Sequence, residues 1–318
     1  MVQFSDFLWP ILFVAALRSP YFQKFRNSTT MRFSSLFWPV VIIAALTTLS
    51  RYQLENYSDI LESRYTVYGE SLNKPAVVLI PGLDGATAFF SDISPELTPN
   101  FQVVVFNLPL HPRNATESYS FGSINNELQQ VLNELNLKDV TLVGESFGGI
   151  VAQHFALDHP DKVNKMVLLS SLAKTELPPE IQFKLDYLMP VIATFGSYFP
   201  HFAQLLFAQI HVDDVVEPFE ARSVRQLFLK EASFAHFFSV LARIKLAATL
   251  DIAAQVPSIQ TPTLVVYGED DHFTKKDSFQ LHSLLPRSEL KSLPGGHLAH
   301  LTSPKQFARF VKEFATKE

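Results

Sequence analysis

The residue best placed to do chemistry in this 318-residue chain is a serine between two glycines, in the run Gly144-Glu-Ser146-Phe-Gly148. An apolar run at 140–143 precedes it, and a helical pattern follows at once. This strand–turn–helix context is typical of a serine nucleophile. Side chains at Gly144 and Gly148 would collide in so tight a turn. We therefore expect Ser146 to be the nucleophile, with a helix N-terminus directed at the negative oxygen that its attack creates.

A neutral serine attacks poorly unless a base takes its proton and an acid orients that base. After a turn of this kind the acid comes next along the chain and the histidine last. Asp271 lies in a loop behind the apolar run 263–267, and catalytic side chains collect where the strands of such sheets end. His297 follows paired glycines near the C-terminus. We predict that His297 is the base and Asp271 the orienting acid, with Asp270 as the alternative.

The oxygen that becomes negative during attack also needs hydrogen-bond donors. One is expected from the residue after the nucleophile, and one from the loop behind the first central strand. These positions are Phe147 and Leu83, and Gly82 lets the second loop turn its N–H groups toward the site. Asp84 is expected to bond the backbone of its own loop.

The remaining histidines are more often structural than catalytic. His154 lies on the helical pattern behind the nucleophile. His300 is expected on the outer side of its loop or against the inserted helical region described below. No His, Asp and Glu cluster has the spacing of metal ligands, so we predict neither a metal nor a cofactor.

The elements that must position these residues follow an α/β pattern. Short β-branched runs alternate with amphipathic stretches, which predicts a mainly parallel sheet flanked by helices. The expected strands are 64–68 at an edge, 76–80, 102–106, 140–143, 165–169 and 263–267, and the expected helices are 123–135, 147–158, 279–285 and 304–314.

The alternation breaks once, between residues 171 and 262. This stretch contains helical patterns rich in Phe, Leu and Ala and no convincing strand. An insertion of this kind between two strands of a parallel sheet predicts a helical cap at about 172–262. We expect one α/β domain over 52–318 that includes this cap.

The first 51 residues have a different composition. The apolar stretch 4–17 aligns without gaps to the start of a second one, 33–49, which indicates a short duplication. A membrane-spanning helix needs about 20 apolar residues, and only the second stretch reaches the lower end of that range. Basic residues before it place the catalytic part on the lumenal, extracytoplasmic side of a membrane, with the membrane as a partner. The alternatives are a cleaved signal peptide, which makes the chain secreted, and a pair of core helices.

The overall composition narrows the function further. The formal net charge is −5 and the chain has no basic block, so we expect no nucleic-acid partner. Without cysteine the chain has no disulfide, no thiolate metal site and no cysteine nucleophile. The oligomeric state is left open.

Taken together, the motifs resemble the α/β-hydrolase superfamily from about residue 52 to the C-terminus. The resemblance rests on Pro-Gly-Leu-Asp-Gly at 81–85, Gly-Glu-Ser-Phe-Gly-Gly at 144–149, Gly-Glu-Asp-Asp at 268–271 and Gly-Gly-His at 295–297. Within the superfamily, the first two motifs look like those of plant phytyl ester synthases, and 138–171 looks like maspardin, a relative considered non-catalytic. The run 107–113 departs from the Asp-x-x-Gly-x-Gly segment that many relatives have at this place.

These observations predict a serine hydrolase that cleaves a carboxylic ester through an acyl-enzyme. The Phe-rich cap and the apolar N-terminal region favour an apolar acyl substrate such as a lipid ester. Two alternatives stay open, namely an acyltransferase that uses the same three side chains and a non-catalytic binding protein.

Overall fold

A seven-stranded sheet forms the centre of the computed structural model, which describes residues 63–69, 74–111, 118–177 and 179–317. The strand order is β1-β3-β2-β4-β5-β6-β7, and only β1 runs antiparallel to its neighbour. The strands are β1 Tyr65–Tyr68, β2 Ala76–Ile80, β3 Gln102–Phe106, β4 Val140–Glu145, β5 Val163–Leu169, β6 Thr263–Gly268 and β7 Ser288–Leu293. The predicted α/β fold class is therefore confirmed.

The central strands are apolar because helices cover both faces of the sheet. Every residue of β2 and of β4 is buried, as expected for parallel strands covered on both sides. On one face the core is formed with α5 (Phe121–Glu134), α6 (Phe147–Asp158) and α12 (Lys275–Leu284). On the other face it is formed with α4 (Ser94–Leu97), α13 (Ala299–Thr302) and α14 (Pro304–Thr316).

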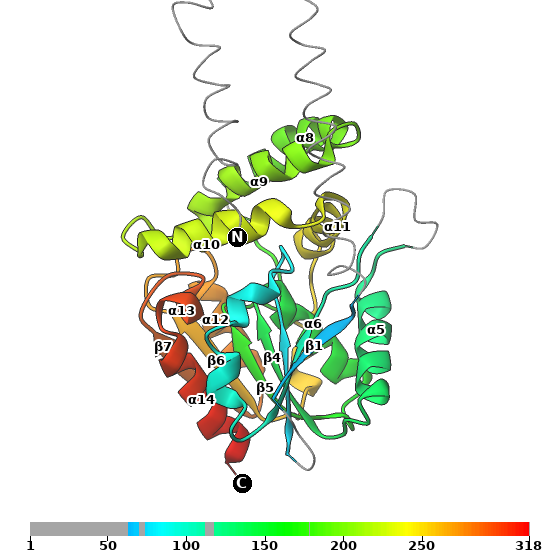
Figure 1. Ribbon diagram of the computed structural model, residues 1–318, viewed down its shortest axis with the longest axis vertical. Coiled ribbons are helices and arrows are strands. Elements are labelled where there is room, and N and C mark those ends of the chain that lie inside the picture. The colour runs from blue at the N-terminus through cyan, green and yellow to red at the C-terminus, as the bar shows by residue number, and fades with distance from the viewer. Residues whose placement is uncertain (1–62, 70–73, 112–117, 178, 318) are drawn as a thin grey trace, which may run out of the picture. The chain divides into compact units, whose positions relative to one another are not determined.

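A helical cap lies between β5 and β6, as predicted. It consists of α7 Pro179–Phe183, the π-helical turn η3 Lys184–Leu188, α8 Met189–Gly196, α9 Pro200–Val215, α10 Arg222–Phe234 and α11 Phe237–Ala248. Figure 1 shows α8 to α11 stacked across one end of the sheet. This end is the carboxyl edge of the parallel strands, where β4 runs into α6 and where β6 ends.

The structure adds one strand that the sequence pattern did not predict. β7 pairs in parallel with β6 over its whole length and forms an edge of the sheet. Its sequence, Ser-Glu-Leu-Lys-Ser-Leu, is mostly polar because an edge strand keeps one side open to solvent. The predicted helix at 279–285 also begins earlier, at Lys275.

The predicted localisation needs a correction. No helix among the described residues is long and apolar enough to cross a bilayer, so the prediction of a chain attached to a membrane by such a helix, with its catalytic part on the lumenal side, is wrong. The stretches that carried it, 4–17 and 33–49, lie outside the described residues, as does the predicted boundary between 1–51 and 52–318. The prediction used the length of the apolar stretches and the basic residues before the second one, and that length only reached the lower limit for a span.

Burial in the sheet predicts where truncation destabilises the fold. Leu142 is fully buried at the centre of β4, whereas Leu206 on α9 is 39% exposed. We expect Leu142→Ala to lower the free energy of unfolding by about 2–5 kcal/mol through lost contacts and a cavity. Leu206→Ala, the same chemical change, should cost less than about 1 kcal/mol. Urea denaturation of the two variants measures the difference, and equal losses would contradict the assigned packing.

Candidate active site

The backbone at Ser146 has an unusual conformation. Its φ is 52° and its ψ is −114°, a region that a residue with a side chain rarely occupies. Ser146 lies between the end of β4 and the start of α6, and its N–H donates to the Leu169 carbonyl at 2.8 Å. A Cβ at Gly144 would lie 2.4 Å from the Gly148 oxygen, and one at Gly148 would lie 2.1 Å from the Ile80 oxygen. Both glycines are therefore required for this turn.

His297 lies within hydrogen-bond distance of Ser146. Its Nε2 is 3.0 Å from the Ser146 Oγ, and its side chain is almost entirely buried. The rings of Phe273 and His297 pack edge to face, with their centres 5.2 Å apart. The histidine comes from the loop between β7 and α13, so the two side chains that the sequence predicted as nucleophile and base are brought together from positions 151 residues apart.

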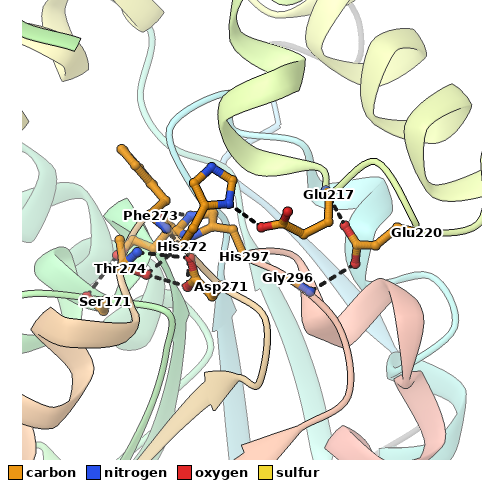
Figure 2. Close-up of polar contacts among 10 residues, drawn as sticks. Ser171, Glu217, Glu220, Asp271, His272, Phe273, Thr274, Gly296 and His297 are labelled. Carbon is orange, nitrogen blue, oxygen red and sulfur yellow. Dashed lines mark hydrogen bonds and ion pairs between the residues drawn. The ribbon is translucent and has the colours of Figure 1, made fainter. Parts of the chain in front are cut away.

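Asp271 faces the other nitrogen of the imidazole, as Figure 2 shows. Its Oδ2 is 3.3 Å from His297 Nδ1, and its Oδ1 accepts the N–H groups of Phe273 and Thr274 at 2.8 and 2.9 Å. Asp270, the alternative predicted from the sequence, is exposed. The structure therefore places Asp271, and not Asp270, beside the imidazole.

Thr274 is a member of this group that sequence reasoning missed. Its hydroxyl donates to Asp271 Oδ2 at 2.7 Å, and its oxygen lies 3.1 Å from His297 Nδ1. Because the hydroxyl hydrogen goes to the carboxylate, the oxygen is free to accept the Nδ1 hydrogen as well. Thr274 thus holds the acid and the imidazole in one arrangement. Its place three residues after the acid, at the start of α12, was the only signal available in the sequence.

The charges of this group stabilise each other. Burial opposes ionisation of Asp271, but the charge of His297 and the hydrogen bonds from His297 and Thr274 outweigh it and hold the pKa of Asp271 below its usual range. Burial likewise lowers the pKa of His297, but the charge and hydrogen bond of Asp271, with Glu145 and Glu220, raise it overall. The site therefore favours the protonated form of the His297 imidazole.

Glu145 connects the nucleophile turn to the loop at 82–85. It is buried, and its Oε2 accepts the Gly82 N–H at 2.7 Å. A Cβ at Gly82 would lie 2.6 Å from Glu145 Oε1, so a side chain at this position would displace the carboxylate. Burial raises the pKa of Glu145 to about 7, although His297 and the Gly82 N–H act in the opposite direction. The sequence contained Glu145 inside the serine motif but no sign of this bond.

Arg243 on α11 ties the same loop to the cap. The guanidinium is buried and donates to the Leu83 carbonyl at 3.0 Å, the Leu108 carbonyl at 3.3 Å and the Tyr119 hydroxyl at 3.1 Å. Leu83 thus has its carbonyl held by the cap. Its N–H stays the predicted donor to a substrate oxygen, together with that of Phe147, the first residue of α6.

The turn between α9 and α10 reaches the loops of the acid and the histidine (Figure 2). Glu220 accepts the Gly296 N–H at 3.1 Å and the Thr302 hydroxyl at 2.7 Å, while Glu217 bonds His272. Side chains of the cap therefore fix the residue before His297 and the residue after Asp271. These contacts join segments far apart in the chain, and no sequence motif indicated them.

A small cavity of about 20 Å³ opens above Ser146 between the sheet and the cap. Such a space holds about one water molecule. Its apolar lining consists of Leu83, Ala86, Phe89, Val215, Phe228 and Leu298, and its polar lining includes Asp84 and His211. A ligand larger than a water molecule therefore needs the cap or the side chains around Ser146 to move.

Two predictions about neighbouring residues were wrong. His300 is fully buried against the rings of Phe89, Phe90 and Phe307, and not on the outer side of its loop or against the cap. Burial lowers its pKa to about 3, so it is a neutral core residue. Asp84 makes no hydrogen bond from its Oδ1 within the described part of the chain, and the turn is closed instead by Gly85 N–H and Gly82 O at 2.9 Å.

The fold and the site together define an α/β protein with a serine, histidine and aspartate at the carboxyl edge of its sheet. A family model described as the alpha/beta hydrolase fold matches residues 75–304, and the chain belongs to this family of hydrolases. The superfamily predicted from the motifs is confirmed.

Relatives and solved structures agree with this membership. RutD of Serratia proteamaculans, named as a candidate carbamate hydrolase, is 28% identical over 77% of this chain and 94% of its own. A thermophilic esterase from Thermogutta terrifontis has a TM-score of 0.68 at 20% identity, over 79% of this chain and 92% of its own. The enol-lactonase from Burkholderia xenovorans has a TM-score of 0.67 at 18% identity, over 80% of this chain and 96% of its own. At these identities the two structures show the fold alone.

The raised pKa of Glu145 predicts how stability depends on pH. Because the folded chain binds this proton more tightly than the unfolded chain, stability should fall as pH rises from 4.5 through about 7. Glu145→Gln keeps an acceptor for Gly82 and removes the charge. We expect it to gain stability relative to the original chain between pH 5 and pH 8, by up to roughly 3 kcal/mol.

Urea denaturation at the two pH values measures this gain. Glu96→Gln, the same substitution at an exposed position of α4, is the matched control. Parallel changes in all three proteins would show that Glu145 carries no such proton.

Proposed function

We propose that this chain is a serine hydrolase that cleaves a carboxylic ester through an acyl-enzyme. The observation that carries the proposal is the 3.0 Å approach of His297 Nε2 to Ser146 Oγ, with Asp271 on the opposite side of the imidazole. This is the arrangement that a serine needs in order to lose its proton as it attacks. Family membership supports hydrolysis as the reaction class.

The proposed reaction runs in two halves. Ser146 Oγ attacks the ester carbonyl carbon while its proton passes to His297 Nε2, and the carbonyl oxygen becomes negative. The N–H groups of Leu83 and Phe147 receive that oxygen. The C–O bond to the alcohol then breaks and the alcohol leaves with the proton from His297. A water molecule repeats the sequence, with His297 as base, and releases the acid.

The cavity favours a short, apolar acyl group. Its walls beside Ser146 are largely apolar, but its volume in this structure is only about 20 Å³. Several cap aromatics that suggested a lipid ester point outward, since Phe183, Tyr187 and Tyr198 are 61, 66 and 75% exposed. A lipid ester therefore has less support from the cavity than from the composition of the cap.

The first experiment tests the nucleophile. We expect a fluorophosphonate probe to label the chain, because the probe reacts with a serine whose proton a base can take. Ser146→Ala should abolish labelling, whereas Ser283→Ala, at an exposed position of α12, should keep it. Intact chain that stays unlabelled would support the alternative of a non-catalytic binding protein.

The second experiment tests the acyl group. Among p-nitrophenyl esters we expect kcat/KM for acetate and butyrate to exceed that for decanoate by at least about tenfold. The reason is that a short acyl chain fits into the closed cavity with the least rearrangement of the protein. Spectrophotometric release of nitrophenol gives the rates. A preference for decanoate would instead support a lipid ester as the substrate. If the chain is an acyltransferase, adding a long-chain alcohol to the reaction should yield a new ester of that alcohol.

Carbamate hydrolysis is a second candidate. It is favoured by RutD, which aligns over 94% of its own length at 28% identity. The same serine and histidine can attack a carbamate carbonyl. Release of ammonia from a carbamate, measured beside ester turnover on one preparation, would show which substrate is used faster.

A further inference from the structure

A single carboxylate of the cap holds the segment that carries His297. The Oε1 atom of Glu220 accepts the Gly296 N–H at 3.1 Å and the Thr302 hydroxyl at 2.7 Å. Gly296 directly precedes His297, and Thr302 ends α13 behind it, so the two contacts lie on both sides of the proposed base. Figure 2 shows Glu220 reaching Gly296 from the cap.

The backbone before His297 needs restraint from outside. Gly295 has a φ of 114°, and neither Gly295 nor Gly296 has a side chain to limit its backbone. On the sheet side, the Asp270 N–H donates to the Gly295 carbonyl at 3.0 Å. On the cap side, Glu220 holds the Gly296 N–H. Fixing such a flexible segment costs conformational entropy, and these contacts offset that cost.

The Glu220 side chain is itself fixed by the turn from which it comes. In the turn 217–220 the Glu220 N–H donates to the Glu217 carbonyl at 3.0 Å, and Pro218 restricts the backbone. The Glu217 N–H donates in return to Glu220 Oε2 at 2.9 Å. Each carboxylate oxygen thus accepts a backbone N–H, one from the turn and one from Gly296. A side-chain amide has only one oxygen and could accept only one of them.

The charge of Glu220 also acts on His297. Burial lowers the pKa of His297, and Asp271 raises it through its charge and a hydrogen bond. The charges of Glu145 and Glu220 raise it further, so that this pKa lies above its usual value. His300, on which His297 acts electrostatically, is neutral because burial lowers its pKa to about 3. Asp271 and Glu145 belong to the α/β domain, so Glu220 is the contribution of the cap.

We propose that Glu220 is a positioning residue for His297, which holds the loop of the base in place while the turn 217–220 lies on that loop. The inference rests on the proposed ester hydrolysis and adds a residue of the cap to it. Movement of the turn away from the loop removes the hydrogen bonds to Gly296 and Thr302 together with the negative charge. The base is therefore fully positioned only when the cap is closed.

The pH dependence of the reaction tests the role of the charge. His297 must be neutral to act as a base, so kcat/KM for p-nitrophenyl acetate should rise with pH through the pKa of His297. Glu220→Gln removes a negative charge and should move the midpoint of this rise to lower pH. Glu180→Gln, the same substitution at an exposed position of α7, should leave the midpoint in place. Glu145, whose pKa of about 7 lies in the same range, is unchanged in both variants.

A role in stability alone would not move the midpoint, because a smaller folded fraction lowers the whole curve. Circular dichroism across the same pH range checks that each variant is folded throughout.

The rate of fluorophosphonate labelling tests the hydrogen bonds. Glu220→Ala removes both contacts to the segment of His297, and labelling of Ser146 should slow by about tenfold or more because the imidazole is no longer held beside it. Glu220→Gln can keep the Gly296 contact and should be slowed less. Glu180→Ala should be labelled at the rate of the intact chain.

The outcomes separate this inference from the proposed function. An unchanged midpoint in Glu220→Gln would overturn the positioning role and leave ester hydrolysis intact. Labelling of Glu220→Ala at the rate of the intact chain or faster would overturn it too, because the base would then be in place without the cap. If the intact chain shows neither labelling nor turnover, the proposed function itself fails.

Discussion

The backbone of Ser146, with its φ of 52°, is the constraint on which the rest of the site depends. A residue with a side chain adopts such a conformation only where its surroundings impose it. Here they do so through close packing, because the chain around Gly144 and Gly148 leaves no space for a Cβ atom. The strain directs the hydroxyl away from the sheet and toward His297. A looser turn would leave the same serine among the buried atoms of β4 and α6.

Around that turn the protein buries several charges and balances them locally. Asp271, His297, Glu145 and Arg243 all have 3% or less of their surface exposed. A buried charge is tolerated only when an opposite charge or several hydrogen bonds compensate it. Asp271 has the imidazole, Thr274 and two backbone N–H groups, and Arg243 has carbonyls of two loops and a tyrosine hydroxyl. This mutual compensation fixes side-chain positions that apolar packing alone would leave variable.

The cap holds two loops of the site in place as well as covering the site. Arg243 holds the loop of Leu83, and Glu220 holds the backbone directly before His297. Because both contacts join the cap to residues of the proposed reaction, a movement of the cap that admits substrate also acts on these loops. Entry of a ligand and the positions of the loops of Leu83 and His297 are thereby coupled through hydrogen bonds at two separate places.

Local patterns in the sequence determined the strands, the cap and the nucleophile turn of this protein. The β-branched runs defined the buried strands, and the Phe- and Ala-rich stretch defined the cap, because burial on both faces and the absence of strand periodicity are both readable in one dimension. Gly144, Ser146 and Gly148 defined the nucleophile turn, since its sterics involve only neighbours in the chain. The length of the apolar stretches, by contrast, led to the wrong prediction of membrane attachment.

Contacts between distant segments were decided only by the tertiary structure. Choosing Asp271 over Asp270, seating Thr274 beside the imidazole and pairing Glu145 with Gly82 each depend on where two loops meet, which spacing along the chain does not specify. The same holds for the edge strand β7, whose polar sequence pairs only because β6 offers it a partner. It also holds for His300, which is buried by three phenylalanine rings from two distant segments. Sequence identifies the groups that can react, and packing in three dimensions decides which of them meet.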